Sequence, residues 1–247
     1  MAAAIKLHRH VGRRRAARFL AEGPNLVEAA MRRNLVIEVF VTEAALSRFG
    51  PILADVPVHV VTDRAAKALS DTVTPVGLVA VCDVPSTSLA DVLADQPRLV
   101  AVAADISEPG NAGTLIRIAD AMGADAVVLA GNSVDAYNPK TVRASVGSLF
   151  HLPFALEADP VRAVRAAQES GLVVLAADGD GELALGDAAG LLAGPVAWLF
   201  GNEAWGLPAE LAAEADHRVR IPIRGRAESL NLATAAAICL HESSRTR

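Results

Sequence analysis

Three short segments carry polar residues of types that do chemistry, and each follows an apolar stretch typical of a buried strand. In the first segment, residues 105–117, Pro109, Gly110 and Gly113 predict a tight turn into a helix. Asn111 is suited to capping that helix, whose first backbone amides would be free to meet an anion.

Arg117 lies in the same predicted helix, within an otherwise apolar stretch. An arginine in such a setting needs an anionic partner if it is buried. The alternative is an exposed arginine with ordinary solvation. On the first interpretation, Arg117 is a candidate site residue.

The second segment, residues 200–208, places Gly201 at the end of an apolar strand and Asn202 and Glu203 directly after it. A carboxylate and a carboxamide in that position can bind amines, hydroxyls or a neighbouring backbone loop. The alternative is a helix N-terminus, where acidic residues are favourable.

The third segment, residues 221–232, has Ser229 and Asn231 just before a strongly apolar helix. Ser229 is either part of a site or a simple N-cap. Ligands of open α/β sheets bind at the carboxyl ends of strands, which is where all three segments fall.

The elements that would position these segments alternate regularly after residue 98, which predicts a parallel sheet covered on both faces. The expected strands are 99–105, 124–130, 172–177, 195–200 and 217–223. The expected helices are 112–123, 138–147, 160–170, 207–213 and 230–242.

The N-terminal part predicts a smaller α/β unit. Its expected strands are 35–41, 57–61 and 77–82, and its expected helices are 42–48, 63–70 and one ending at 33 that Asn25 could cap. Residues 84–98 are rich in Pro, Ser and Thr and indicate a linker with one helical turn. We expect domains at 1–83 and 98–247, joined by a linker at 84–97.

The composition excludes several classes of protein. Of the 247 residues, 52% are hydrophobic and 21% charged, which predicts a well-buried core and excludes disorder. No apolar run approaches the roughly 18 residues of a membrane span, and no secretory signal is visible. Cys82 and Cys239 lack partners at metal-ligand spacing, so we expect a cytoplasmic protein with reduced cysteines and no metal.

The charge distribution indicates an anionic partner despite a net charge of −5. Residues 1–33 carry a net charge of +6, and the other 214 residues carry −11. Such asymmetry suggests a localised anion-binding face on an acidic body, and a solvated basic helix is the alternative. The sequence has neither the glycine fingerprint of a dinucleotide site nor a Walker loop.

Taken together, the three segments resemble the motifs of the SpoU/TrmH family of RNA ribose methyltransferases over residues 99–243. The matching residues are Asn111, Gly113 and Arg117, then Gly201, Asn202, Glu203 and Gly206, then Pro222, Gly225, Ser229, Leu230 and Asn231. Residues 15–23 resemble the start of the small RNA-binding domain that many members carry, a domain similar to a kink-turn-binding ribosomal protein.

This resemblance implies an α/β methyltransferase domain with a trefoil knot, a homodimer and S-adenosylmethionine as the cofactor. The candidate catalytic residues are Arg117, Asn111, Glu203, Ser229 and Asn231. The candidate cofactor-binding residues are Ala176, Asp178, Gly201, Asn202, Ile221 and Leu230. The candidate RNA-binding residues are Arg13, Arg14, Arg15, Arg18, Lys140 and Arg143.

The implied reaction is methylation of a ribose 2′-hydroxyl in RNA. General-base action is hard for a guanidinium with a pKa above about 12. We therefore expect Arg117 to stabilise the developing alkoxide and to contact the adjacent phosphate. Ribosomal RNA is the favoured substrate, and transfer RNA is the alternative. Two rival functions are a non-catalytic RNA-binding protein and a nucleotide-dependent oxidoreductase.

Overall fold

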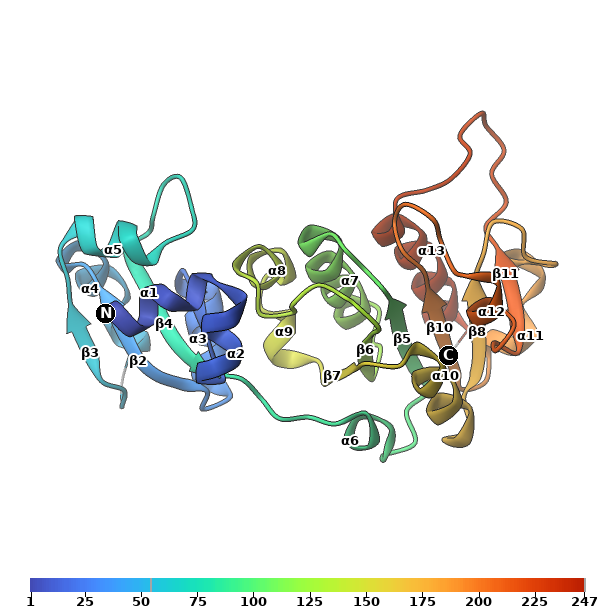
Figure 1. Cartoon of the computed structure of the whole chain (residues 1–247), viewed down its shortest axis with the longest axis horizontal. Coiled ribbons are helices and arrows are strands. Elements are labelled where there is room, and N and C mark those ends of the chain that lie inside the picture. The colour runs from blue at the N-terminus through green and yellow to red at the C-terminus, as the bar shows by residue number, and fades with distance from the viewer. Residues whose placement is uncertain (54, 247) are drawn as a thin grey trace. The chain divides into compact units, whose positions relative to one another are not determined.

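The computed structural model describes residues 1–53 and 55–246, and the chain forms two compact units. The first unit combines residues 1–86 with residues 135–151. The second comprises residues 87–134 and the chain from residue 152 onward. Figure 1 shows the elements of both units.

The first unit has a four-stranded sheet in the order β1-β4-β2-β3. β4 pairs antiparallel with β1 and β2, and β3 pairs parallel with β2. The strands are β1 (Arg18–Glu22), β2 (Val36–Val41), β3 (Val58–Val60) and β4 (Leu78–Asp83). The helices are α1 (Ala2–Ile5), α2 (His10–Ala16), α3 (Pro24–Arg32), α4 (Glu43–Phe49), α5 (Asp63–Leu69), α8 (Pro139–Ser145) and α9 (Ser148–His151), with 3₁₀ turns at Lys6–His8 and Gly50–Ile52.

The start of α3 corrects one predicted cap. The helix begins at Pro24 with Gly23 as its N-cap, so Asn25 lies inside the helix and does not cap it. Proline suits the first helical position because its φ angle is already helical and its missing N–H would have no partner there.

Residues 135–151 belong to the first unit, whereas the sequence placed them in the second domain. The packing of Phe19 explains the difference. This side chain of β1 is fully buried, and its ring centroid lies 4.7 Å from that of Tyr137 and 5.9 Å from that of Phe150. The segment thus completes the aromatic part of the first unit's core.

Arg13 is the exception among the arginines predicted to bind RNA, because its side chain is only 4% exposed. Its Nε and Nη2 atoms donate to Oδ2 of Asp135 at 2.8 and 2.6 Å. Its Nη1 donates to the carbonyls of Leu7 and His8 at 2.8 and 2.9 Å. These bonds occupy all three guanidinium nitrogens, so the prediction of an RNA contact for Arg13 is wrong.

The second unit has a seven-stranded parallel sheet in the order β7-β6-β5-β10-β8-β11-β9, which confirms the predicted α/β fold. Its strands are β5 (Leu99–Ala104), β6 (Ala126–Ala130), β7 (Phe154–Glu157), β8 (Val173–Ala177), β9 (Leu183–Ala184), β10 (Val196–Phe200) and β11 (His217–Arg220). Its helices are α6 (Leu89–Leu93), α7 (Pro109–Ala121), α10 (Pro160–Glu169), α11 (Ala189–Leu192), α12 (Ala209–Ala212) and α13 (Leu232–Arg245), with a 3₁₀ turn at Leu185–Asp187.

Helices cover both faces of this sheet, as the continuous apolar strands require. On one face, Val164 of α10 and Leu211 of α12 pack in a cluster with Val102 and Leu199 of the central strands. On the other face, α13 packs against β10 and α7. The buried indole of Trp198 in β10 donates to Oγ of Ser243 in α13 at 2.8 Å, which ties that helix to the sheet.

Within the described residues, no helix is long and apolar enough to cross a membrane, and no cluster of metal-ligating side chains is found. Cys82 and Cys239 are free thiols. Burial raises the pKa of both to about 12.

Arg13→Ala is expected to lower the free energy of unfolding by about 3–5 kcal/mol, because it removes a buried guanidinium and leaves Asp135, whose side chain is only 17% exposed, without its partner. Denaturant titration followed by circular dichroism measures this change. Arg14→Ala is the matched control, since Arg14 is exposed on the same helix and should change stability by less than about 0.5 kcal/mol. Equal stability of the two variants would contradict the buried role of Arg13.

Candidate active site

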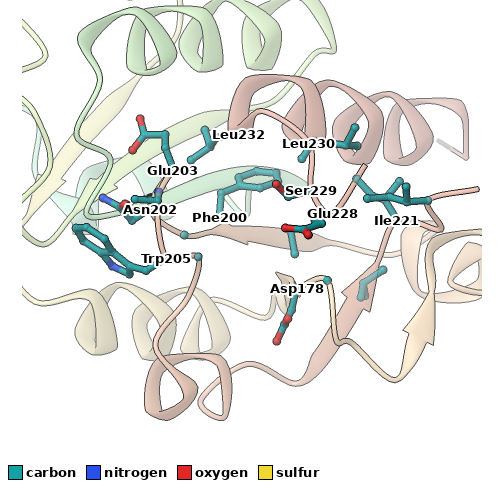
Figure 2. A pocket seen from close by; sticks show the side chains of 18 residues that line it. Asp178, Phe200, Asn202, Glu203, Trp205, Ile221, Glu228, Ser229, Leu230 and Leu232 are labelled. Atoms are coloured by element: carbon teal, nitrogen blue, oxygen red, sulfur yellow. Dashed lines mark hydrogen bonds between the residues drawn. The ribbon is translucent and has the colours of Figure 1, made fainter. Parts of the chain in front are cut away.

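The carboxyl ends of β8, β10 and β11 surround a cavity of about 360 Å³ in the second unit (Figure 2). Residues from four stretches line it: 177–179, 200–206, 219–223 and 228–235. This is the location that open α/β sheets favour for a ligand. The second and third polar segments of the sequence therefore meet at one pocket.

The turn after β10 is held rigidly by backbone and side-chain hydrogen bonds. The backbone groups of Asn202 and Gly206 bond reciprocally, both at 2.9 Å. The Asn202 side chain donates to the carbonyl of Asp105 at 2.6 Å and accepts from the amide of Ala204 at 2.8 Å. Asn202 thus borders the pocket while its side chain secures the turn.

Gly201 has a steric reason to be glycine. A Cβ atom at this position would lie 2.3 Å from the carbonyl carbon of Gly206 and 2.4 Å from its oxygen. No real Cβ approaches backbone so closely, so any larger residue would force the turn at 202–206 away from the strand.

Glu203 joins this turn to the first polar segment. Its Oε2 accepts from the amide and hydroxyl of Ser107 at 3.0 and 2.9 Å. Its Oε1 accepts from the amide of Glu108 and from Nδ2 of Asn111, both at 3.0 Å. Partial burial opposes ionisation of Glu203, but these hydrogen bonds outweigh it and lower its pKa from 4.5 to about 2.

Asn231 extends the same network to the third segment. Its Oδ1 accepts from the amides of Ala233 and Thr234 at 2.9 and 3.3 Å, which caps α13. Its Nδ2 donates to Oδ1 of Asn111 at 3.1 Å. One chain of hydrogen bonds therefore runs from α13 through Asn111 to Glu203.

The structure contradicts the predicted cap at Asn111 and the alternative that Ser229 is a simple N-cap. Asn111 does not cap α7, because the helix begins at Pro109 with Glu108 as its N-cap, and the Asn111 side chain bonds across to the neighbouring segments instead. Ser229 does not cap α13, because Asn231 holds that position. Ser229 is exposed and lines the pocket.

Arg117 is exposed on α7, so the interpretation of a buried arginine with an anionic partner is wrong and the exposed alternative holds. It lies two helical turns beyond the Pro109 end and does not line the pocket. Among the described residues it has no hydrogen-bond or ion-pair partner. Arg165, Arg218 and Arg220 of the same unit all bond to acidic or carbonyl groups. The guanidinium of Arg117, unlike these three, is therefore free to bind a group from outside the chain.

The pocket lining has the chemistry of a site for a cationic, partly apolar ligand. Asp178, Glu203 and Glu228 contribute carboxyl groups, and no Lys, Arg or His belongs to the described lining. Asp178 also has a partner outside the lining, since its carboxylate lies 3.7 Å from Nη1 of Arg218. The apolar wall consists of Phe200, Val219, Ile221, Ile223, Leu230, Leu232 and Ala235.

Of the residues predicted to bind a cofactor, the structure brings five to this pocket and leaves one out. Those at the pocket are Asp178, Gly201, Asn202, Ile221 and Leu230. Ala176 is fully buried inside β8 and does not line it. The sequence reasoning missed Phe200, Glu228 and Trp205, although all three stand in or beside the motif segments.

The remaining residues predicted to bind RNA lie in the first unit. Arg14 and Arg15 are exposed near the end of α2. Arg18 is exposed and lies 3.6 Å from Asp83. On α8, Lys140 is exposed, whereas Arg143 is half-buried and pairs with Asp71 at 3.0 Å.

Comparison with known proteins supports the fold. Residues 98–241 match the SpoU rRNA Methylase family, and residues 3–80 match the MRM3-like substrate binding domain. A Bacillus subtilis protein named 23S rRNA (guanosine(2553)-2′-O)-methyltransferase RlmP is 32% identical over 96% of this chain and 92% of its own length.

Solved structures agree over both units. The SpoU methyltransferase AviRb from Streptomyces viridochromogenes, in complex with AdoMet, has a TM-score of 0.88 at 30% identity and covers 98% of this chain and 95% of its own. An AdoMet-bound rRNA methyltransferase from Sinorhizobium meliloti has a TM-score of 0.87 at 30% identity, with coverages of 99% and 93%.

The fold and the pocket define a class: a methyltransferase with a parallel α/β sheet and an N-terminal substrate-binding domain. Within that class, the chain belongs to the SpoU rRNA methylase family. The resemblance seen in the three motifs is thereby confirmed.

Glu203→Gln is expected to destabilise the second unit by about 1–3 kcal/mol at neutral pH, because one amide cannot accept from all four donors. A carboxylate with a lowered pKa stabilises the fold above its unfolded pKa of 4.5 and loses this effect as the pH falls towards about 2. The difference between wild type and variant should therefore narrow below pH 4.5.

Unfolding free energies of the two proteins, measured across this range, test the expectation. Glu210→Gln is the matched control, since Glu210 is exposed on α12. A wild-type advantage that is constant with pH would show that the ionised carboxylate is not what holds the loop.

Proposed function

We propose that the chain transfers a methyl group from S-adenosylmethionine to a ribose 2′-hydroxyl of ribosomal RNA. The observation that carries the proposal is the pocket at the strand ends, beside which the hydrogen bonds of Glu203, Asn111 and Asn231 join the three motif segments. Transfer RNA is the alternative substrate. Relatives from Bacillus subtilis and Streptomyces viridochromogenes are named as 23S rRNA methyltransferases, which favours ribosomal RNA.

The pocket suits S-adenosylmethionine better than a dinucleotide. The cofactor carries a sulfonium and an ammonium group, and the carboxylates of Asp178 and Glu228 complement such charges. A dinucleotide would bring phosphates to a lining with no basic residue among those described. Ile221 and Leu230 would contact the adenine and ribose region. When bound, the cofactor supplies an activated methyl group.

Arg117 would act on the RNA. Its guanidinium N–H groups would donate to the 2′-oxygen as that oxygen bonds to the methyl carbon and the hydroxyl proton passes to water, and would contact the adjacent phosphate. A guanidinium with a pKa above about 12 stays protonated and does not act as the base. Glu203 and Asn111 would be positioning residues, because they fix the start of the helix that carries Arg117.

The first unit would bind the RNA. It contains thirteen basic and nine acidic residues, whereas the second contains ten basic and nineteen acidic residues. Phosphate groups favour the more basic unit, and Arg14, Arg15 and Arg18 are its exposed candidates. The domains would span 1–83 and 98–247 in sequence, with residues 135–151 packed on the first.

We also propose a trefoil knot in the second unit, a homodimer and a cytoplasmic location, as the family resemblance implies. The return of α13 from the 221–231 loop to pack on α7 and β10 is the arrangement that a knot would need. Two buried free thiols fit a reducing compartment.

Calorimetric titration with S-adenosylmethionine, with NAD as the control, tests the proposed cofactor site. We expect saturable binding of S-adenosylmethionine alone. Binding of NAD would favour the oxidoreductase. No binding of either ligand, even with ribosomal RNA present, would favour the non-catalytic RNA-binding protein.

Arg117→Ala is expected to lower the rate of methyl transfer about 100- to 1,000-fold, the effect of losing a donor to a developing oxyanion. Affinity for S-adenosylmethionine should not change, because Arg117 lies outside the pocket. Single-turnover transfer of a labelled methyl group measures the rate. Arg162→Ala, at an exposed position on α10, is the control. Near-normal turnover by Arg117→Ala would exclude this role.

A further inference from the structure

Trp205 is an exposed tryptophan at the pocket. Its side chain is 68% exposed, although it belongs to the largest and most hydrophobic of residue types. The chain has one other tryptophan, Trp198, which is fully buried and hydrogen-bonded to Ser243. An indole kept in water on a binding site is typical of a residue that contacts a ligand.

The backbone beneath Trp205 is rigid. Trp205 lies in the turn that the reciprocal bonds of Asn202 and Gly206 close, and Glu203 anchors the same turn to α7. Both of its neighbours, Ala204 and Gly206, are small and exposed. The turn therefore offers a flat aromatic surface at a fixed place, with little entropy left to lose on binding.

The position of the indole points to the RNA side of the pocket. Figure 2 shows Trp205 with Asn202 and Glu203 at one end of the pocket, and Ile221 and Leu230 at the other. Glu203 bonds to the start of the helix that carries Arg117. The end with Trp205 is therefore the end where the methyl acceptor would enter.

We propose that the indole of Trp205 stacks on a base of the RNA at the mouth of the pocket and thereby positions the ribose for reaction. The inference rests on the proposed function and adds a contact of the catalytic unit itself. This unit is acidic, so it gains little from phosphates, whereas stacking on a base needs no positive charge. An indole stacks on any of the four bases, so the contact holds the acceptor in place without reading its sequence.

Trp205→Ala is expected to weaken binding of an unmodified 23S rRNA transcript about 5- to 100-fold, the range for loss of one base–aromatic stack. Trp205→Phe, which keeps a ring, should restore most of the affinity. Calorimetry should give the same affinity for S-adenosylmethionine in all three proteins. An equal loss of cofactor affinity in Trp205→Ala would instead make the indole a cover for the cofactor and overturn the proposal.

Tryptophan fluorescence gives a readout that does not depend on catalysis. A single-stranded oligouridylate should quench wild-type emission, whereas an abasic strand of equal length and charge should not. Trp205→Phe retains only Trp198 and should respond to neither strand. Equal quenching by both strands would overturn base stacking.

The outcomes separate this proposal from the proposed function. Base-dependent quenching without any binding of S-adenosylmethionine would keep the stack and reject the methyltransferase. Binding of S-adenosylmethionine, together with unchanged RNA affinity in Trp205→Ala, would keep the methyltransferase and reject the stack. If Trp205→Ala sediments at half the wild-type mass, the indole contacts a second copy of the chain, and the proposal is overturned.

Discussion

The carboxylate of Glu203 is the constraint on which the site depends. It accepts four hydrogen bonds from a loop almost a hundred residues earlier in the chain, and its charge persists because those bonds lower its pKa to about 2. Asn111, which donates to Glu203, also accepts a hydrogen bond from Asn231, the N-cap of α13, so the network includes that helix. This network links three loops at the edge of the sheet.

The order of the strands in the parallel sheet explains why the single carboxylate of Glu203 can join two segments that are far apart in the sequence. β5 and β10 are neighbours, so the residues that follow them emerge side by side at one edge. The close approach of Gly201 to Gly206 lets the turn after β10 fold back tightly, and Asn202 fastens that turn to the end of β5. Glu203 then faces the start of α7. The pocket is thus a consequence of strand order as much as of the polar residues around it.

The sequence predicted the parts of the molecule that have strong periodicity or motif spacing. The continuously apolar strands β5, β6, β8 and β10 were recognised, since parallel strands buried on both faces are apolar throughout. The strands β1, β7 and β9 were missed: β1 begins and ends with a charged residue, β7 has four residues and β9 has two. Contacts across the chain escaped for a different reason: spacing could not show that Arg13 meets Asp135, that residues 135–151 pack on Phe19, or that Trp205 borders the pocket.

The most direct test of this account is a double-mutant cycle between Glu203 and Asn231, which share Asn111 but have no hydrogen bond to each other. The measured quantity is affinity for S-adenosylmethionine in wild type, Glu203→Gln, Asn231→Ala and the double variant. If one network holds the site, the double variant should lose little more affinity than the worse single variant. Losses that simply add would show that the two residues act independently and would contradict the account.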